Sequence, residues 1–185
     1  MPKTKIKIKT VYILLFRGVG GATQLPTAPL RQALSEAGFE NVATYINSGN
    51  AVLRSGLSRE KVIASVAKIC DDGFGFTKAI YAPTLAEWEA LLTNNPFPAF
   101  KEGKHLHAAI LAGVPAREAI ERLRGYAVEG EAIEVVGRVA YLHTPHGFGT
   151  SKLAVKFDKG VGVENTARNW NTVLRLLELA KKAAG

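Results

Sequence analysis

Polar and apolar residues alternate at the start of the chain. Lysines alternate with apolar or small residues over 3–9, and an unbroken apolar run follows from Val11 to Phe16. The alternation predicts a strand with one solvent-facing side, and the run predicts a strand buried on both faces. This strand ends at a turn that contains Gly18, Gly20 and Gly21.

The next sixty residues carry two helical patterns and three short strand patterns. The first helix is expected after Thr27, its predicted N-cap, and its apolar stripe consists of Leu30, Ala33, Leu34 and Ala37. Two short apolar runs, 42–46 and 51–53, flank Asn47-Ser48-Gly49-Asn50, a sequence typical of a hairpin turn. A second helix after Ser58 and a strand over 77–81 complete the element order β-α-β-β-α-β.

The middle of the chain predicts a connecting helix. Thr84 and Glu87 have the spacing of a capping box, and the helix that they begin buries Trp88, Leu91 and Leu92. Residues 95–103, which contain two prolines, are the one stretch with the composition of a linker.

The second half repeats the element order without repeating the sequence. A strand over 105–111 precedes a helix opened by Pro115, and a hairpin over 133–142 turns at Gly137-Arg138. A glycine-rich loop over 146–149 leads to helical sequence from Ser151 onward. The final helix is expected to carry an apolar stripe made of Trp170, Val173, Leu174, Leu177 and Ala180.

These patterns predict an α+β protein with two ferredoxin-like halves. Each half is expected to form a mostly antiparallel sheet with its helices on one face, and an extra helix follows at the C-terminal end. The expected division is 1–82 for the first half, 83–103 for the connecting helix and linker, and 104–185 for the second half. We expect one compact unit, because halves of about 80 residues are marginally stable alone.

Composition narrows the class of protein. Hydrophobic residues make up 47% of the chain and charged residues 22%, which excludes wholesale disorder. Lysine and arginine exceed aspartate and glutamate by 24 − 16 = 8, so the chain is basic. No apolar run is long enough to span a membrane, and the single cysteine, Cys70, excludes an intrachain disulfide. We therefore expect a soluble cytoplasmic protein that needs no cofactor and has no membrane partner.

Two polar segments in the first half are candidates for binding. Arg17 begins a glycine-rich turn, and successive backbone amides in such a turn bind anions. The hairpin tip adds the side chains of Asn47, Ser48 and Asn50. Both segments also have a purely structural interpretation, as a tight strand–helix turn and as ordinary turn chemistry.

The segment 166–172 is the richest in polar side chains. Arg168, Asn171, Thr172 and Arg175 have helical spacing, which predicts a basic polar stripe on the final helix opposite its apolar stripe. Asn169 belongs to the same segment, and Ser151 and Lys152 lie upstream, where Lys152 is expected to add a cation to this surface. The alternative is that the asparagines and threonines cap the helix and satisfy a neighbouring loop.

Histidines and cysteine offer weaker candidates. His105 and His107 share one face of a strand, and a metal site there needs a third ligand such as His143 or His146. Surface positions are the simpler interpretation, and Cys70 on the inner stripe of its helix is expected to be an inert core thiol.

Five ordered stretches resemble the bacterial domain-of-unknown-function family numbered 1697. They are 15–21 (Leu-Phe-Arg-Gly-Val-Gly-Gly), 44–50 (Thr-Tyr-Ile-Asn-Ser-Gly-Asn), 95–97, 151–153 and 167–173 (Ala-Arg-Asn-Trp-Asn-Thr-Val). Two departures stand out: family members usually have an Ile-Asn pair inside the first motif and Met in place of Thr27. The resemblance implies a compact α+β fold with duplicated ferredoxin-like units and brings no established activity.

Three functions are compatible with this sequence. The first is binding of a phosphorylated small molecule or a nucleic acid through a basic polar surface, although the aromatic RNA-binding strand motif is absent. The second is an enzyme that acts on an anionic small molecule, for which no nucleophile–base pair is recognisable. The third is a scaffold or interaction protein whose polar motifs are structural. The sequence leaves the oligomeric state undetermined.

Overall fold

The computed structural model describes residues 8–46, 49–100 and 102–185. The chain divides into two compact units, which are described separately below. Unit 1 comprises Met1–Glu89 together with Leu176–Gly185, and unit 2 comprises Ala90–Arg175. Among the described residues, no helix is both long enough and apolar enough to cross a membrane.

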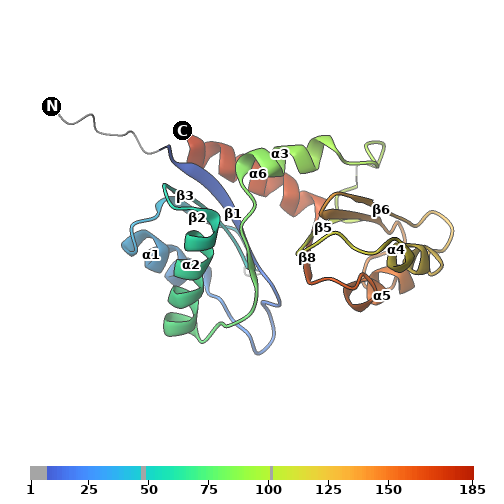
Figure 1. Ribbon diagram of the computed structural model, residues 1–185, viewed down its shortest axis with the longest axis horizontal. Coiled ribbons are helices and arrows are strands. Elements are labelled where there is room, and N and C mark those ends of the chain that lie inside the picture. Colours follow the sequence, from blue (N-terminus) through green and yellow to red (C-terminus); the bar gives the residue numbers. More distant parts are fainter. Residues whose placement is uncertain (1–7, 47–48, 101) are drawn as a thin grey trace. The chain divides into compact units, whose positions relative to one another are not determined.

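Unit 1 contains a four-stranded antiparallel sheet and two helices that pack on it (Figure 1). Its sheet order is β2-β3-β1-β4. The elements in chain order are β1 (Thr10–Phe16), α1 (Thr27–Glu36), β2 (Glu40–Thr44), β3 (Asn50–Ser55), α2 (Arg59–Phe74) and β4 (Ile80–Tyr81). The hairpin β2–β3 and the two β-α-β crossovers follow the order that the sequence predicts.

The core of unit 1 follows from strand and helix periodicity. Alternate residues of β1, including Leu14 and Phe16, pack with Leu34 of α1 and Val66 of α2. Every residue from Val11 to Phe16 is at most 6% exposed. The unbroken apolar run therefore forms a strand that is buried on both faces, as predicted.

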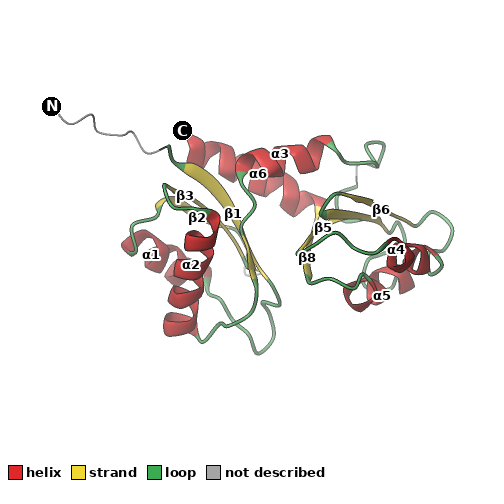
Figure 2. Ribbon diagram, viewed as in Figure 1, coloured by secondary structure: helices red, strands yellow, loops and turns green. Residues whose placement is uncertain are grey.

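Unit 2 repeats the same topology with sheet order β6-β7-β5-β8. Figure 2 shows α4 and α5 on one side of this sheet. The elements are β5 (Leu106–Leu111), α4 (Arg117–Arg124), β6 (Ala132–Val136), β7 (Val139–His143), α5 (Lys152–Gly160) and β8 (Asn165–Asn169). The predicted fold class, α+β with two βαββαβ halves and a C-terminal helix, is confirmed.

Two helices are divided between the units. These are α3 (Leu85–Thr93) and α6 (Trp170–Ala184). The predicted capping box starts α3, because the Glu87 amide donates to Thr84 Oγ1 and the Thr84 amide donates to the Glu87 carboxylate. Residues 176–185 of the C-terminal region belong to unit 1, whereas the sequence pattern groups them with the second half.

Two details of the sequence interpretation are wrong. Residues 165–169 form the edge strand β8, where the sequence predicts helical structure. Cross-strand pairing with β5 outweighs the helical spacing of these few residues, and α6 begins only at Trp170. Thr27 is the first residue of α1 rather than its N-cap, which is Pro26.

Candidate functional site

The glycine-rich turn begins where β1 ends. The Arg17 amide donates to the carbonyl of Ala79, which fixes the start of the turn to the segment that leads into β4. Gly18, Gly20 and Gly21 all have positive φ, so a glycine suits each position. Within the described part of the chain, the amides of Gly18, Val19 and Gly21 donate to no other group of the protein. They are therefore available to an external acceptor.

The structure brings the hairpin tip against this turn. Asn50 lies opposite Leu15 in the β1–β3 register, and the Phe16 amide donates to the Gly49 carbonyl at 2.9 Å. A Cβ atom at Gly49 would lie 2.7 Å from Val19 Cγ2. The two polar segments that the sequence singles out in the first half thus meet at one end of the unit 1 sheet. Asn47 and Ser48 lie outside the described residues.

Lys78 is a member of this site that the sequence analysis missed. Its ammonium donates to the Gly18 carbonyl at 3.0 Å, although the residue is exposed. The antiparallel pairing of Phe16 with Ile80 explains the contact, because it places the residues just before β4 beside those just after β1. Only the strand order, with β4 beside β1, could have identified Lys78 as part of this site. Lys78 therefore brings a cation to the turn that Arg17 begins.

The Asn50 side chain stabilises the hairpin. Its side chain is 1% exposed, and its Nδ2 donates to the Tyr45 carbonyl at 3.3 Å. A buried amide that is bonded to backbone stabilises the turn and presents little to a ligand. This contact favours the structural interpretation for Asn50.

The polar segment of the second half divides between a strand and a helix. Asn169 ends β8, and its Oδ1 accepts from the Thr172 amide at 3.0 Å. This is an N-cap interaction for α6, and the Thr172 side chain is buried. Asn169 therefore takes the capping role that the sequence analysis held open as the alternative, and Thr172 supplies the amide that is capped.

Asn171 lies close to the backbone of Gly103. The Trp170 amide donates to the Gly103 carbonyl at 3.0 Å, and a Cβ at Gly103 would lie 2.9 Å from the Asn171 amide nitrogen. The Trp170 ring lies 6.4 Å from the Tyr141 ring. This region of the motif thus joins α6 to the segment that precedes β5.

Arg168 lies on the strand and not on the final helix. Its Nη1 donates to Thr166 Oγ1 at 2.7 Å and to the Ala167 carbonyl at 2.8 Å. Burial lowers the pKa of Arg168 to about 10, so the guanidinium remains charged at neutral pH. The predicted stripe of Arg168, Asn171, Thr172 and Arg175 on one helix is therefore absent, because Arg168 precedes the helix.

Ser151 and Lys152 open α5. Ser151 Oγ accepts from the Ala154 amide at 3.1 Å, as expected of the predicted N-cap. Lys152 Nζ lies 5.3 Å from the centre of the Tyr126 ring, a cation–π contact. Ala167 packs on the helix-side core, so strand alternation turns Arg168 to the opposite face of the sheet. The expected common surface of Lys152 and Arg168 is not formed.

His107 lies on the helix side of the unit 2 sheet. Its ring stacks on Phe148 with 3.8 Å between centroids, and its Nδ1 is buried and without a hydrogen-bond partner in the described structure. Burial, with a smaller contribution from His105, lowers the pKa of His107 to about 4. No group of three His, Cys, Asp or Glu side chains among the described residues is arranged to hold a metal ion.

The pKa of His107 predicts a specific pH dependence of stability. The folded protein disfavours the protonated ring, so the unfolded chain binds more protons between pH 6.5 and about 4. The free energy of unfolding should therefore fall as the pH is lowered through this window. Urea unfolding of His107→Phe, which keeps an aromatic ring and cannot be protonated, should show a smaller loss. Equal losses in both proteins would assign the effect to other groups.

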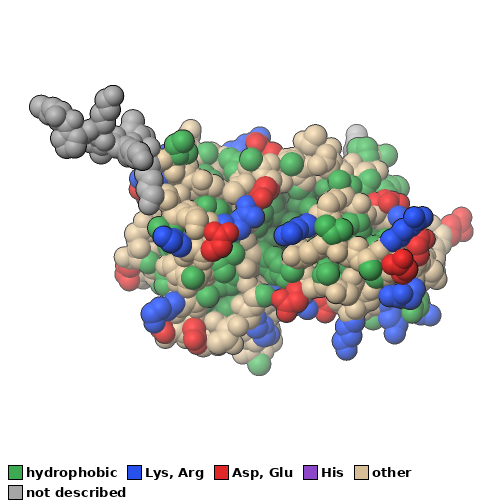
Figure 3. Space-filling view, viewed as in Figure 1, with side chains coloured by type: hydrophobic (Ala, Val, Ile, Leu, Met, Phe, Trp, Pro, Cys, Tyr) green, Lys and Arg blue, Asp and Glu red, His purple; other side chains and the backbone are tan. Residues whose placement is uncertain are grey.

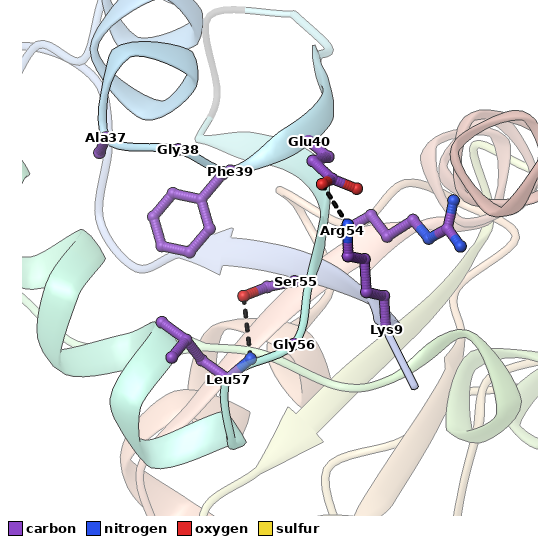
Figure 4. A pocket seen from close by; sticks show the side chains of 9 residues that line it. All are labelled: Lys9, Ala37, Gly38, Phe39, Glu40, Arg54, Ser55, Gly56 and Leu57. Atoms are coloured by element: carbon purple, nitrogen blue, oxygen red, sulfur yellow. Dashed lines mark hydrogen bonds and ion pairs between the residues drawn. The ribbon is translucent and has the colours of Figure 1, made fainter. Parts of the chain in front are cut away.

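A shallow hollow of about 250 Å³ lies at the start of β2 (Figure 4). Lys9, Glu40 and Arg54 line it, and Lys9 forms an ion pair with Glu40. The Lys9 hydrogen bond lowers the pKa of the Glu40 carboxyl. Glu40 thus balances the lysine charge within the hollow, and Arg54 adds one further cation to its lining.

Comparison with solved structures supports the fold. The structure of a conserved bacterial protein, SP0830 from Streptococcus pneumoniae, is similar to this chain with a TM-score of 0.72 and 23% sequence identity. The similarity covers 94% of this chain and 99% of that one. No curated protein matches the sequence.

A family model provides the remaining comparison. The model described as "Protein of unknown function (DUF1697)" matches residues 9–141, which include the glycine-rich turn, the hairpin and most of unit 2. The resemblance inferred from the sequence motifs is thereby confirmed. The chain belongs to the DUF1697 family.

Proposed function

We propose that this protein binds a phosphorylated small molecule at the end of β1 in unit 1. The observation that carries the proposal is the Lys78–Gly18 hydrogen bond, which holds an ammonium at the turn that Arg17 begins, where three backbone amides are open. The hairpin packs closely against the turn at Gly49.

The chemistry of this turn suits a phosphate group. An ammonium and a guanidinium neutralise its charge, and charged donors make stronger hydrogen bonds than neutral ones. Backbone amides in a glycine-rich turn add donors without side chains that would block a close approach. The ligand is expected to be an anion that accepts several hydrogen bonds at once.

A small molecule fits better than a nucleic acid. On the face visible in Figure 3, lysine and arginine side chains are spread among acidic and uncharged ones and do not form one continuous basic surface. A nucleic-acid interface neutralises many phosphates along a track. The end of β1 supplies two cations, which is enough for one phosphate group.

Calorimetric titration tests the proposal. Adenosine monophosphate and glucose 6-phosphate serve as probes, with adenosine and glucose as their uncharged counterparts. We expect at least one phosphate ester to bind and its uncharged counterpart to fail. Arg17→Ala and Lys78→Ala should each weaken binding roughly tenfold or more, because a hydrogen bond to a charged group contributes about 1.5–3 kcal/mol.

Two controls separate the site from general charge effects. Arg122→Ala removes an exposed cation from α4 in unit 2 and should leave the affinity unchanged. A short single-stranded RNA tests the alternative ligand. The proposal fails if neither ester binds, if Arg122→Ala weakens binding as much as Arg17→Ala does, or if RNA alone binds.

A further inference from the structure

A hollow of about 320 Å³ lies at the C-terminal end of α2. It is lined by residues of α2 and of the segment that follows this helix, among them Lys68, Asp71, Asp72, Thr77 and Lys78. Lys78 belongs to two places at once, because it lines the hollow and its ammonium donates to the Gly18 carbonyl at 3.0 Å. The hollow is therefore a neighbour of the glycine-rich turn, within the same unit of the chain.

Lys78 approaches the turn closely. A Cβ atom at Gly18 would lie 3.1 Å from Lys78 Nζ and 3.2 Å from Lys78 Cδ, so the lysine side chain lies along the glycine backbone. One side chain thus separates the open amides of the turn from the hollow. The organic part of a phosphate ester that is bound at the turn can reach the hollow by passing this one side chain.

The formal charges of the hollow sum to zero, since two lysines and two aspartates line it. Lys68 forms an ion pair with Asp72 at 2.7 Å. The Asp71 carboxylate forms no hydrogen bond or ion pair among the residues that the structure describes. The hollow therefore presents a hydrogen-bond acceptor without an excess of negative charge. Such a place suits an uncharged donor, for example a hydroxyl group, better than it suits an ammonium group.

The position of Asp71 does not stabilise its own helix. Asp71 lies in the last turn of α2, where the free carbonyl groups carry a partial negative charge. A carboxylate is disfavoured at such a place, and the last turn of α2 contains no basic residue that would offset it. Departures of this kind from local preference are expected at functional positions.

We propose that the phosphorylated ligand of unit 1 is a sugar phosphate, whose phosphate binds at the glycine-rich turn and whose hydroxyl groups bind in this hollow. The Asp71 carboxylate accepts from one sugar hydroxyl, and the Thr77 hydroxyl, which both donates and accepts, contacts another. The volume of the hollow is at the lower end of the roughly 300–1,000 Å³ of ligand pockets, which suits a single sugar ring. This inference rests on the phosphate site proposed above and names the class of molecule that the site selects.

Calorimetric titration with three phosphate esters tests the sugar assignment. Glucose 6-phosphate carries several hydroxyl groups, methyl phosphate carries none, and O-phosphoethanolamine carries an ammonium group instead. We expect glucose 6-phosphate to bind roughly tenfold more tightly than either of the others, because hydrogen bonds to a charged acceptor are among the stronger ones. Asp71→Ala should abolish this preference and leave the affinity for methyl phosphate unchanged, since the contacts of the phosphate at the turn remain.

Glu118→Ala is the matched control, because it removes an exposed carboxylate from α4 in unit 2 and should change none of the three affinities. Thermal unfolding checks the fold of the test variant. Asp71→Ala should be at least as stable as the unaltered protein, because it removes a carboxylate from the C-terminal end of a helix.

The outcomes separate the sugar assignment from the phosphate site. If methyl phosphate binds as tightly as glucose 6-phosphate and Lys78→Ala weakens both, the phosphate site stands and the sugar assignment is wrong. The assignment is also wrong if O-phosphoethanolamine binds most tightly, or if Asp71→Ala has no more effect than Glu118→Ala. If none of the three esters binds, the phosphate site fails and the sugar assignment fails with it.

Discussion

Gly49→Ala is expected to lower the free energy of unfolding by about 2–4 kcal/mol. Gly49 has φ +73°, a conformation that costs other residues about 1–2 kcal/mol. The new methyl group would also lie 2.7 Å from Val19 Cγ2 and 2.9 Å from the Phe16 carbonyl oxygen. Overpacking of this kind costs about 1–3 kcal/mol, because the Phe16 backbone belongs to the sheet and has little room to move.

Urea denaturation measures this loss, with Gly21→Ala as the matched control. Gly21 has φ +58°, and nothing lies within 4 Å of a Cβ placed there. Its substitution carries the conformational cost without the collision, so the difference between the variants isolates the contact between hairpin and turn. If the two variants lose equal stability, the close contact of Gly49 with Val19 and Phe16 does not limit the space at this position.

Gly103→Ala is expected to cost about 1–3 kcal/mol by the same overpacking mechanism. Here the backbone is not in the left-handed region, so the effect is steric alone. A Cβ at Gly103 would lie 2.6 Å from Asn171 Cγ and 2.9 Å from the Asn171 amide nitrogen. The Trp170 amide bond to the Gly103 carbonyl holds the two segments at this distance.

Thermal unfolding of two further variants checks the cause. Gly113→Ala should be close to neutral, since Val163 Cγ1 at 3.9 Å is the one atom near its Cβ. The double variant Gly103→Ala, Asn171→Ala removes the collision of the new Cβ with the Asn171 side chain but keeps its collision with the Asn171 amide nitrogen. It should therefore recover part of the stability that Gly103→Ala alone loses. A strictly additive double variant would show that Asn171 does not limit the approach.

Local patterns were sufficient to predict most of the fold. The apolar run at Val11–Phe16, the turn at Gly137-Arg138 and the capping box at Thr84 depend on neighbours in sequence. The strand β8 does not, because its stability comes from pairing with β5, more than fifty residues earlier in the chain. Its mostly polar sequence, Asn-Thr-Ala-Arg-Asn, lacks the apolar alternation that would mark a strand.

The candidate site was predictable in its parts and not in its assembly. The turn at Arg17 and the hairpin before Asn50 were evident as separate polar segments. The contact between these segments, and the position of Lys78 beside Gly18, depend on the strand order β3-β1-β4, which local sequence does not encode. The roles of Asn50 and Asn169 were equally hidden, because a turn amide and a ligand-binding amide have the same spacing in sequence.

The division of α6 between the units has a consequence for biosynthesis. Trp170–Arg175 completes unit 2, and Leu176–Ala184 returns to unit 1, so unit 2 is continuous in sequence and unit 1 is not. A ribosome that makes the chain from its amino end finishes every element of unit 2 before it delivers the last part of unit 1. The unit that is begun first is therefore the unit that is completed last.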